Sequence, residues 1–417
     1  MDWKKFRDLP IEERLRYVQE KCGLSDEEVR MLRGGFLDED TANHMIENVI
    51  GSIKLPIGIA TNFVVNGKEY LIPMAIEESS VVAAASNAAK LCRGSGGFAA
   101  EADDSIMIGQ IFIRDFDSRA TDRIIAEKDR IRREANPADS TLVASGGGME
   151  DLEVREVGDR LCVHLLIDVK DAMGANFVNS TVERVAPLLE EITGGKVVLK
   201  ILSNLAVYRK VRAKAVWDKG FLEESFKESG DYKAEDIVNG IIELWNIAKE
   251  DPYRRATHNK GMMNGIDALM IATGNDWRAI ESGVHAYSML TGGLLTRFSA
   301  TAEGNLEGFI EIPLAAGIVG GATKINPVAQ VCLKILGVKS AKELACVAAS
   351  VGLANNFAAL RVLSTEGVQR GHMKLHATNI AHMAGANGRN IERVAQIMIQ
   401  EKKISVARAK EILEEII

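Results

Sequence analysis

Residues 161–176 read LCVHLLIDVKDAMGAN, and they set the fold of the middle of the chain. The run from Leu161 to Val169 is mainly apolar, which predicts a buried strand. Glycine and polar residues from Asp171 to Asn176 interrupt the strand, and helical periodicity follows from Ala175 to Ile192. The stretch therefore predicts a strand that leads into a helix through a glycine turn.

The segments around this unit extend it to six elements. We expect a strand from Ile106 to Phe116, a helix from Ala120 to Ala135, a strand from Met149 to Val157 that turns back at Gly158-Asp159, and a last strand from Lys196 to Leu202. The order βαββαβ is the split arrangement of ferredoxin-like folds. We therefore expect a small domain at residues 105–205, inserted into a larger domain.

The rest of the chain is expected to form a mainly helical large domain from residues 1–104 and 206–370, which makes the fold class α+β. A first helix is expected to begin at Pro10, because proline suits the first helical turn. The sequence Ser25-Asp26-Glu27-Glu28 is a capping box for a second helix.

Three further segments place structure in the large domain. Alternation from Ile53 to Ile76 with Asn66-Gly67 in the middle predicts a hairpin. The segment from Ser79 to Cys92 has small, nearly uncharged side chains and predicts a central buried helix. A long Ala-rich segment from Ala341 to Gln369 also predicts a helix.

The C-terminal residues 371–417 are expected to form a helical flap. Glycines within residues 385–388 predict a hinge, which separates two short helices from Asn390 to Glu401 and from Ser405 to Ile416. The pair either moves as a lid or docks as a fixed tail.

Composition excludes several classes of protein. The 417 residues are 47% hydrophobic and carry a net charge of −7, with no basic block that could track nucleic-acid phosphates. The charged N-terminus is unlike a signal peptide, and no apolar run approaches the ~20 residues that span a bilayer. We expect a cytoplasmic protein without a membrane segment. The five cysteines are scattered, which favours buried free thiols over disulfides or a metal site.

Residues 257–276 place a lysine and a carboxylate sixteen positions apart between glycine-marked turns. So many glycine and asparagine residues suggest backbone that bends to present Lys260, Asn264 and Asp276 to a ligand. The alternative is a pair of polar turns with a surface lysine.

Other polar clusters are candidates for chemistry. Glu77 and Glu78 precede the Ala-rich helix, where burial would suit a general acid; the alternative is two solvated carboxylates favoured by the helix dipole. His372 and His376 have helical spacing but no third metal ligand, so His372 is a candidate mobile proton donor or a structural histidine.

Two glycine-rich segments can lie against a ligand. Residues 171–176 open a helix, whose free N–H groups favour an anion such as pyrophosphate; Asp171 as an ordinary N-cap is the alternative. Residues 317–323 form a second glycine loop or a tight packing turn. The Gly-x-Gly-x-x-Gly fingerprint is absent from these segments, which argues against a Rossmann site.

Together these clusters resemble the 3-hydroxy-3-methylglutaryl-CoA (HMG-CoA) reductases over nearly the whole chain. The similar motifs are Glu47 to Gly51, Glu78, Asp171 to Asn176, Gly317 to Thr323 and Gly371-His372-Met373. The Glu77-Glu78-Ser79-Ser80 and His258-Asn259-Lys260-Gly261 sequences are similar to the soluble class II form of prokaryotes.

The resemblance implies reduction of HMG-CoA to mevalonate and CoA with two NAD(P)H, or the reverse oxidation. It implies that Lys260 stabilises the alkoxide, that Asp276 holds Lys260, and that Glu78 supplies or shares the proton. His372 would protonate the departing CoA thiolate. By the same resemblance Ser80, Arg254 and Asn264 would bind the substrate.

The resemblance also implies a dinucleotide site and a homodimer, or an assembly of dimers, with shared active sites and no metal. The cofactor-binding residues would be Asp139, Asp171, Met173, Gly174, Asn176, Gly320 and Gly321. Asp139 would accept hydrogen bonds from the adenosine ribose, so we expect NADH to be preferred to NADPH. Two other classes remain open, a redox-independent CoA-thioester lyase or transferase and a non-catalytic CoA-binding protein.

Overall fold

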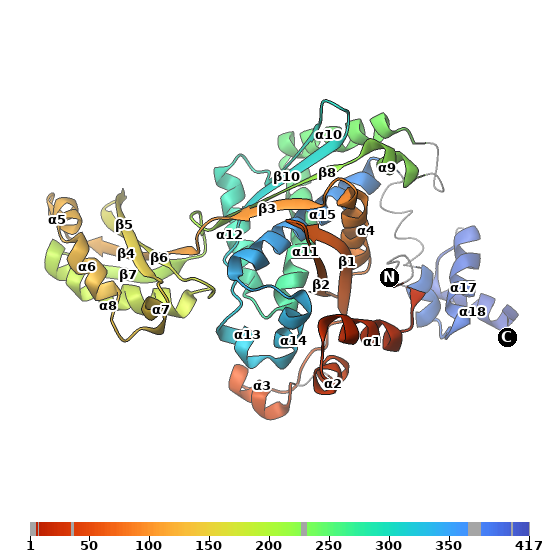
Figure 1. Ribbon diagram of the computed structural model, residues 1–417, viewed down its shortest axis with the longest axis horizontal. Helices are drawn as coiled ribbons and strands as arrows, with labels where there is room; N and C mark the ends of the chain where they lie inside the picture. The colour runs from red at the N-terminus through yellow and green to blue at the C-terminus, as the bar shows by residue number, and fades with distance from the viewer. Residues whose placement is uncertain are drawn as a thin grey trace.

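The computed structural model describes residues 6, 8–34, 37–226, 232–365, 377–401 and 403–416. Two β-sheets form the framework, and each has a separate apolar core. Figure 1 shows the smaller sheet and its helices at one end of an elongated molecule, the larger sheet in the middle, and the C-terminal helices at the other end.

The larger sheet has six strands in the order β2-β1-β3-β8-β10-β9. Its strands are β1 (Ile57–Val65), β2 (Lys68–Ala75), β3 (Phe98–Ala102), β8 (Lys210–Trp217), β9 (Thr296–Ala300) and β10 (Leu306–Pro313). The expected hairpin with its turn at Asn66-Gly67 is confirmed as β1 and β2. Helices dominate after Leu205 as expected, but strands β8 to β10, which were not predicted, also lie there. Buried and less buried side chains alternate along β8 and β10, so a period of two was available in the sequence.

The helices in the same part of the chain are α1 (Ile11–Cys22), α2 (Asp26–Gly34), α3 (Glu39–Met45), α4 (Val81–Arg93), α9 (Lys219–Glu224), α10 (Ala234–Glu250), α11 (Pro252–Ala272), α12 (Trp277–Leu290), α13 (Gly321–Ile325), α14 (Pro327–Leu336) and α15 (Ala341–Leu363). Of these, α4, α10, α11, α12, α14 and α15 pack directly on the larger sheet. The predicted capping box is confirmed, because Ser25 N donates to Glu28 Oε2 at 2.7 Å and Glu28 N donates to Ser25 Oγ at 3.2 Å.

The central helix of the large core is α15, whereas the sequence pattern assigned that place to α4. Helix α4 has an exposed side that carries Asn87 and Lys90, while most of the side chains of α15 are buried. The sequence was expected to contain no apolar run long enough to span a membrane. Helix α15 is long and apolar enough to do so, but 83% of its most apolar 18-residue segment is buried inside the protein.

The smaller sheet has four antiparallel strands in the order β5-β6-β4-β7, which is the ferredoxin-like order predicted for βαββαβ. Its elements are β4 (Ile106–Arg114), α5 (Ala120–Ala126), α6 (Lys128–Ala135), α7 (Thr141–Ala144), β5 (Gly148–Val157), β6 (Arg160–Asp168), α8 (Ala175–Thr193) and β7 (Lys196–Ser203). The single helix expected from Ala120 to Ala135 is therefore two consecutive helices.

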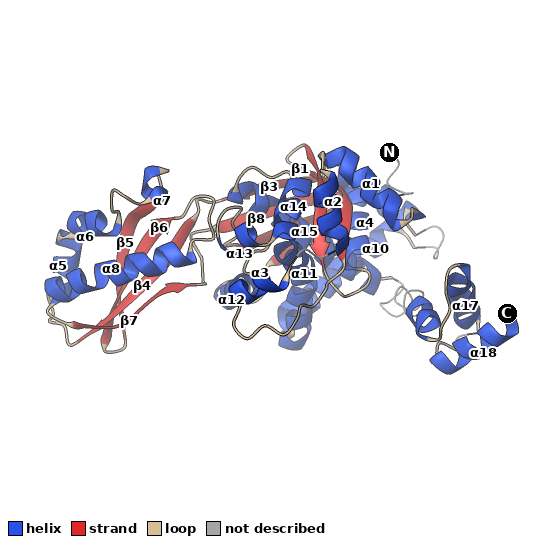
Figure 2. Ribbon diagram, turned by 90° about the horizontal axis from the view of Figure 1, so that it is seen from below, coloured by secondary structure: helices blue, strands red, loops and turns tan. Residues whose placement is uncertain are grey.

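Helices α17 (Arg389–Gln400) and α18 (Val406–Ile416) form a third apolar cluster with residues from Ala377 onward. Figure 2 shows them apart from the two sheets. His372, His376 and the start of the predicted flap lie outside the described residues, so the movement and the boundary of the flap stay predictions.

Candidate active site

Lys260 lies in the middle of helix α11, so the bent loop predicted for residues 257–276 was wrong over most of its length. The helix begins at a cap, where Arg254 N donates to Asp251 Oδ2 at 2.6 Å. Its glycines serve packing: a Cβ on Gly265 would overlap Asn355 on α15, and a Cβ on Gly352 of α15 would lie 2.7 Å from Ile266. The glycines therefore let two helices cross closely, and they do not bend the chain.

Glu78 and Lys260 form an ion pair, with Lys260 Nζ 3.2 Å from Glu78 Oε2. Glu78 lies in the turn between β2 and α4, two residues before Ser80, which has a left-handed backbone with φ of 79°. The side chains of Lys260 and Glu78 are 59% and 43% exposed, so the burial predicted for the carboxylate is not found in the single chain. An ammonium group and a carboxylate therefore meet at an open surface.

Two predicted substrate-binding residues lie on the same helix as Lys260. Asn264 is one turn further along α11 and faces the same side, because residues four apart are helical neighbours. Arg254 is half-buried, and among the described residues no carboxylate lies within ion-pair distance of its guanidinium. Burial lowers the pKa of Arg254 from its ordinary value. A half-buried guanidinium without a partner suits an anionic ligand such as a carboxylate.

A series of hydrogen bonds between buried polar side chains anchors the buried side of α11. His258 Nε2 lies 2.7 Å from Thr296 Oγ1, which donates to Asn356 Oδ1, and Asn356 Nδ2 donates to the His258 carbonyl at 2.9 Å. Since the Thr296 hydroxyl proton is used on Asn356, His258 Nε2 must carry the proton. Burial, and then the charge of Arg254, lower the pKa of His258 to about 3. The imidazole is therefore neutral and structural at ordinary pH.

The two glycine loops predicted to hold the cofactor lie against each other. Ile318 N donates to the Asp171 carbonyl at 2.9 Å, and Ala172 pairs with Val319 in a short parallel bridge. Met173 and Asn176 belong to the first loop and its helix, and Gly320 and Gly321 follow the bridge with φ of 80° and 55°. The structure therefore brings these sequence-distant segments together.

Asp171 does not cap its own helix, so the N-cap alternative was wrong. Gly174 is the N-cap of α8, with φ of 97° and a Cα that lies against Val169. Asp171 Oδ1 instead accepts a hydrogen bond from Ala341 N, at 2.7 Å, at the start of α15. The first glycine loop is thereby joined to the central helix of the core.

Asp276 lies beside these loops and away from Lys260. Gly317 N donates to Asn275 Oδ1 at 2.7 Å, and Thr323 Oγ1 donates to the Thr273 carbonyl at 3.1 Å. Asp276 caps α12 by accepting from Ala279 N at 3.1 Å. Twelve residues of α11 separate Lys260 from Ala272, or about 18 Å along the axis. The lysine and the aspartate of one chain therefore lie far apart, and their surroundings are called here the Lys260 half-site and the cofactor half-site.

Asp139 lies in an exposed turn between α6 and α7. Neighbouring Asn136 fixes the backbone there, because its Oδ1 accepts from Met149 N at 2.7 Å and its Nδ2 donates to the Met149 carbonyl at 3.0 Å. The carboxylate is thus presented to solvent on a supported turn, and its contact with a ribose stays a prediction.

The sequence did not predict a groove of about 2080 Å³ beside Glu78 and Ser80. Its lining includes the exposed side of α4 and the N-terminal helices, and it carries basic side chains from Arg14, Lys21, Lys54, Lys90 and Arg93. The only signal in the sequence was the spacing of Lys90 and Arg93 along one side of an otherwise uncharged helix.

A titratable cluster on α11 and α12 was also missed. His285 Nε2 lies 2.7 Å from Glu281 Oε2. Burial, and then the contact with Glu281, raise the pKa of Asp267. Asp267 lies two turns from Lys260 on the same side of α11, so it borders the Lys260 half-site without touching the Glu78 ion pair.

The chain was compared with known proteins. The family model for hydroxymethylglutaryl-coenzyme A reductase matches residues 10–377. A 3-hydroxy-3-methylglutaryl-coenzyme A reductase of Archaeoglobus fulgidus is 55% identical over 98% of this chain and 93% of its own length. A probable enzyme of the same name from Borreliella burgdorferi is 36% identical over 83% of this chain and 79% of its own length.

Solved structures agree with these sequence matches. The 3-hydroxy-3-methylglutaryl-coenzyme A reductase of Streptococcus pneumoniae is similar with a TM-score of 0.83 and 36% identity over all of both chains. A class II reductase structure from the same organism, bound to NADPH in open conformations, has a TM-score of 0.82 and 37% identity, and covers 88% of this chain and 100% of its own.

Proposed function

The chain belongs to the hydroxymethylglutaryl-coenzyme A reductase family and is an NAD(P)H-dependent oxidoreductase, and from that premise we propose which of its residues perform each part of the reaction. The family reaction reduces HMG-CoA to mevalonate and CoA with two NAD(P)H. Family membership does not favour the lyase, transferase and non-catalytic alternatives.

The ion pair of Lys260 and Glu78 carries the proposal for the chemical step. Hydride addition to the thioester carbon leaves an alkoxide, and the compact ammonium group of Lys260 stabilises that charge. Glu78, 3.2 Å away, supplies or shares the proton. The same centre then reduces mevaldehyde, because the second hydride addition also produces an alkoxide.

Substrate binding is assigned to the surroundings of this pair. Arg254, which has no carboxylate partner among the described residues, binds the carboxylate of the substrate. Ser80 and Asn264 bind the other polar groups of the substrate. The basic groove beside Glu78 takes the phosphates and pantetheine chain of CoA. His372 protonates the departing thiolate when residues 371–417 close as a flap, and this part of the proposal rests on the family motif alone.

A second copy of the chain completes the site. About 18 Å of helix separate Lys260 from Ala272, and Asp276 follows four residues beyond, so we assign the aspartate that holds Lys260 to the partner chain. Ile46, Ile50 and Ile53 are 64%, 104% and 92% exposed around the Glu47 to Gly51 motif, an apolar surface that pairing would cover. A homodimer, or an assembly of dimers, therefore accounts for both features.

The dinucleotide is assigned to the small domain, residues 105–205, and to the two glycine loops. The first loop ends at the start of α8, where backbone N–H groups favour pyrophosphate. We keep NADH as the preferred cofactor, because the exposed carboxylate of Asp139 would accept from a ribose diol and repel a 2′-phosphate. The cytoplasmic location expected from composition is part of the same proposal.

One assay tests the function. Purified protein is incubated with HMG-CoA and either NADH or NADPH, and nicotinamide absorbance is followed together with the release of free thiol. We expect two cofactor molecules to be oxidised for each CoA released, and Lys260→Ala to abolish both signals. Thiol release without cofactor oxidation would instead support the lyase or transferase reading.

A further inference from the structure

A buried arginine joins the two glycine loops. Arg209 lies in the connection between β7 and β8 and is 5% exposed. Its Nη1 donates to the carbonyls of Ala172 at 3.1 Å and Met173 at 3.3 Å in the first loop, and its Nη2 donates to the carbonyl of Ala316, next to the second loop. One guanidinium therefore connects both loops through their backbones.

At Gly317 the backbones of the two loops pack directly against each other. A Cβ on Gly317 would overlap the backbone of Met173 and Ala172. Asn275, next to the proposed catalytic Asp276, accepts from Gly317 N. The position of each loop is thus set by the other, by Asn275 and by Arg209.

The charge of Arg209 has no direct counter-ion. Among the described residues no carboxylate lies within ion-pair distance of its guanidinium. The nearby carboxylates of Asp168 and Asp171 contact Lys170, at 2.7 Å, and Ala341 N, and act on Arg209 only from a greater distance. Burial lowers the pKa of Arg209 to about 10, against the charges of Asp168 and Asp171, which raise it, so the group stays charged at neutral pH. A buried positive charge therefore lies behind the backbone that opens α8.

We propose that Arg209 is a positioning residue for the dinucleotide: it fixes the two glycine loops through three carbonyl groups, and its positive charge favours the anionic pyrophosphate in front of them. The proposal rests on the proposed function, in which these loops bind the cofactor. Arg209 touches neither the reacting atoms nor the substrate.

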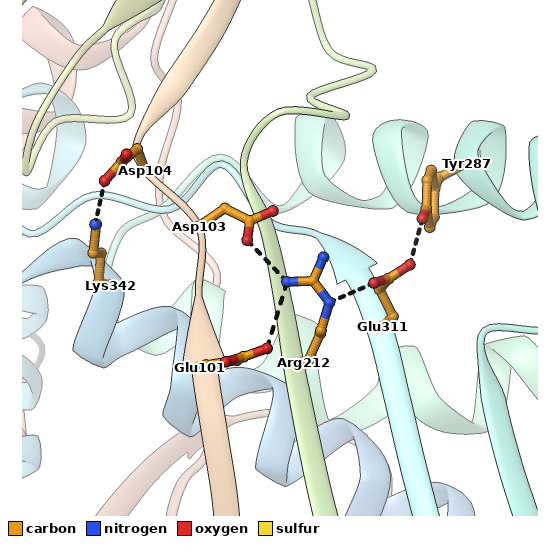
Figure 3. Close-up of polar contacts among 7 residues, drawn as sticks. All are labelled: Glu101, Asp103, Asp104, Arg212, Tyr287, Glu311 and Lys342. Carbon is orange, nitrogen blue, oxygen red and sulfur yellow. Dashed lines mark hydrogen bonds and ion pairs between the residues drawn. The ribbon is translucent and has the colours of Figure 1, made fainter.

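Arg212 supplies a matched control at the same junction of the two domains. Figure 3 shows its guanidinium on β8 between Asp103 and Glu311, at 2.8 and 2.6 Å, with Glu101 at 3.8 Å. Tyr287 donates to Glu311, and Lys342 pairs with Asp104 close by. Arg212 thus holds the junction together by ion pairs and contacts neither glycine loop.

The test compares Arg209→Met, Arg209→Lys and Arg212→Met in the full chain. Dissociation constants for NADH and NADPH are measured by nicotinamide fluorescence without HMG-CoA, and KM for HMG-CoA, kcat and melting temperature are measured alongside. We expect Arg209→Met to weaken dinucleotide binding at least tenfold, about 1.4 kcal/mol, while KM for HMG-CoA changes less than threefold. Arg212→Met should lower the melting temperature and leave dinucleotide binding unchanged.

The lysine variant separates charge from geometry. One ammonium group cannot reach carbonyls on both loops, so Arg209→Lys should still weaken binding but retain more of its salt dependence than Arg209→Met. Equal weakening by Arg209→Met and Arg212→Met would overturn the proposal, since general loosening of the junction would then explain both. If Arg209→Met does not fold, wild-type dinucleotide binding by Arg209→Lys would overturn it. A wild type that binds neither cofactor would instead overturn the proposed function.

Discussion

The cofactor half-site and the Lys260 half-site differ in how many contacts within one chain hold their residues in place. The cofactor loops are held by backbone contacts, by Asn275 and by a buried arginine. In the Lys260 half-site, among the described residues, a contact of 3.2 Å joins Lys260 and Glu78, whose side chains are 59% and 43% exposed. Within a single chain, the proposed cofactor loops are therefore held by several contacts, whereas the proposed chemical centre is open.

In the proposed dimer, this difference predicts which half depends on the partner. Desolvation strengthens charge stabilisation, so an open lysine–glutamate pair becomes an effective oxyanion site only when something covers it. The cofactor half needs no such cover to hold its shape. We therefore expect variants in the Lys260 half to reduce catalysis most, and variants in the cofactor half to change mainly binding.

The largest effect is expected for Lys260→Ala. Both hydride additions generate an alkoxide at one centre, so the rates of HMG-CoA and mevaldehyde reduction should each fall about 100- to 1000-fold. Lys334→Ala is the matched control, because Lys334 also pairs with a glutamate, Glu28 at 2.7 Å, and neither residue lines the groove beside Glu78. Near wild-type mevaldehyde reduction by Lys260→Ala would contradict a shared oxyanion site.

Mixing two inactive variants tests whether the half-sites meet between subunits. Lys260→Ala and Asp276→Ala chains should each be inactive alone. After exchange of subunits, half of the dimers are mixed, and each of these has one intact site, so activity should recover to about a quarter of the wild-type value. Recovery is measured against each variant mixed with itself. An inactive mixture in which subunit exchange is demonstrated would place both residues in one chain's site.

A smaller effect is expected in the cofactor half for Asp139→Ala. Two unit charges about 4 Å apart at an effective dielectric of 20 repel by roughly 4 kcal/mol, and a tenfold preference needs only about 1.4 kcal/mol. The ratio of kcat/KM for NADH to that for NADPH should therefore fall about tenfold, with KM for HMG-CoA unchanged. An unaltered ratio would show that Asp139 does not read the ribose.

The smallest effect on activity is expected from the buried polar side chains that anchor α11. The folded pKa of His258 is about 3, below its ordinary value of 6.5, so between these values the unfolded chain binds a proton that the folded chain does not. Stability is therefore lost as pH falls below about 6.5, by up to about 1.4 kcal/mol per pH unit.

His258→Gln is the comparison for this prediction. Its amide can still donate to Thr296 but does not titrate, so its free energy of unfolding should depend less on pH between 6.5 and 4.5. Urea unfolding at several pH values measures both proteins. Other groups, including His285, titrate in both proteins and cancel in the difference. Parallel curves would mean that His258 is not buried in its neutral form.

Local sequence patterns predicted one half of the molecule better than the other. The ferredoxin-like order was correct because periods of two and 3.6 residues within each segment reported burial directly. The segment around Lys260 was predicted as a loop because its glycines were taken as turn residues. Their role depends on packing against α15, which follows about ninety residues later in the sequence. A local sequence pattern does not report a contact over that separation. Local sequence singled out Lys260, Asn264, Asp276, Glu78 and His372, whereas Ser80, Arg254 and Asp139 came from the family resemblance alone. The roles of all these residues await the experiments above.

The hydrogen bond from Ala341 to Asp171 has a consequence for the time scale on which the cofactor loop moves. This bond ends at the first residue of the buried 23-residue helix α15. Amide protons in such a helix exchange with solvent only when a large part of the core opens. We therefore expect the amide of Ala341 to exchange almost as slowly as the centre of that helix, and the first cofactor loop to stay anchored on every time scale shorter than global unfolding.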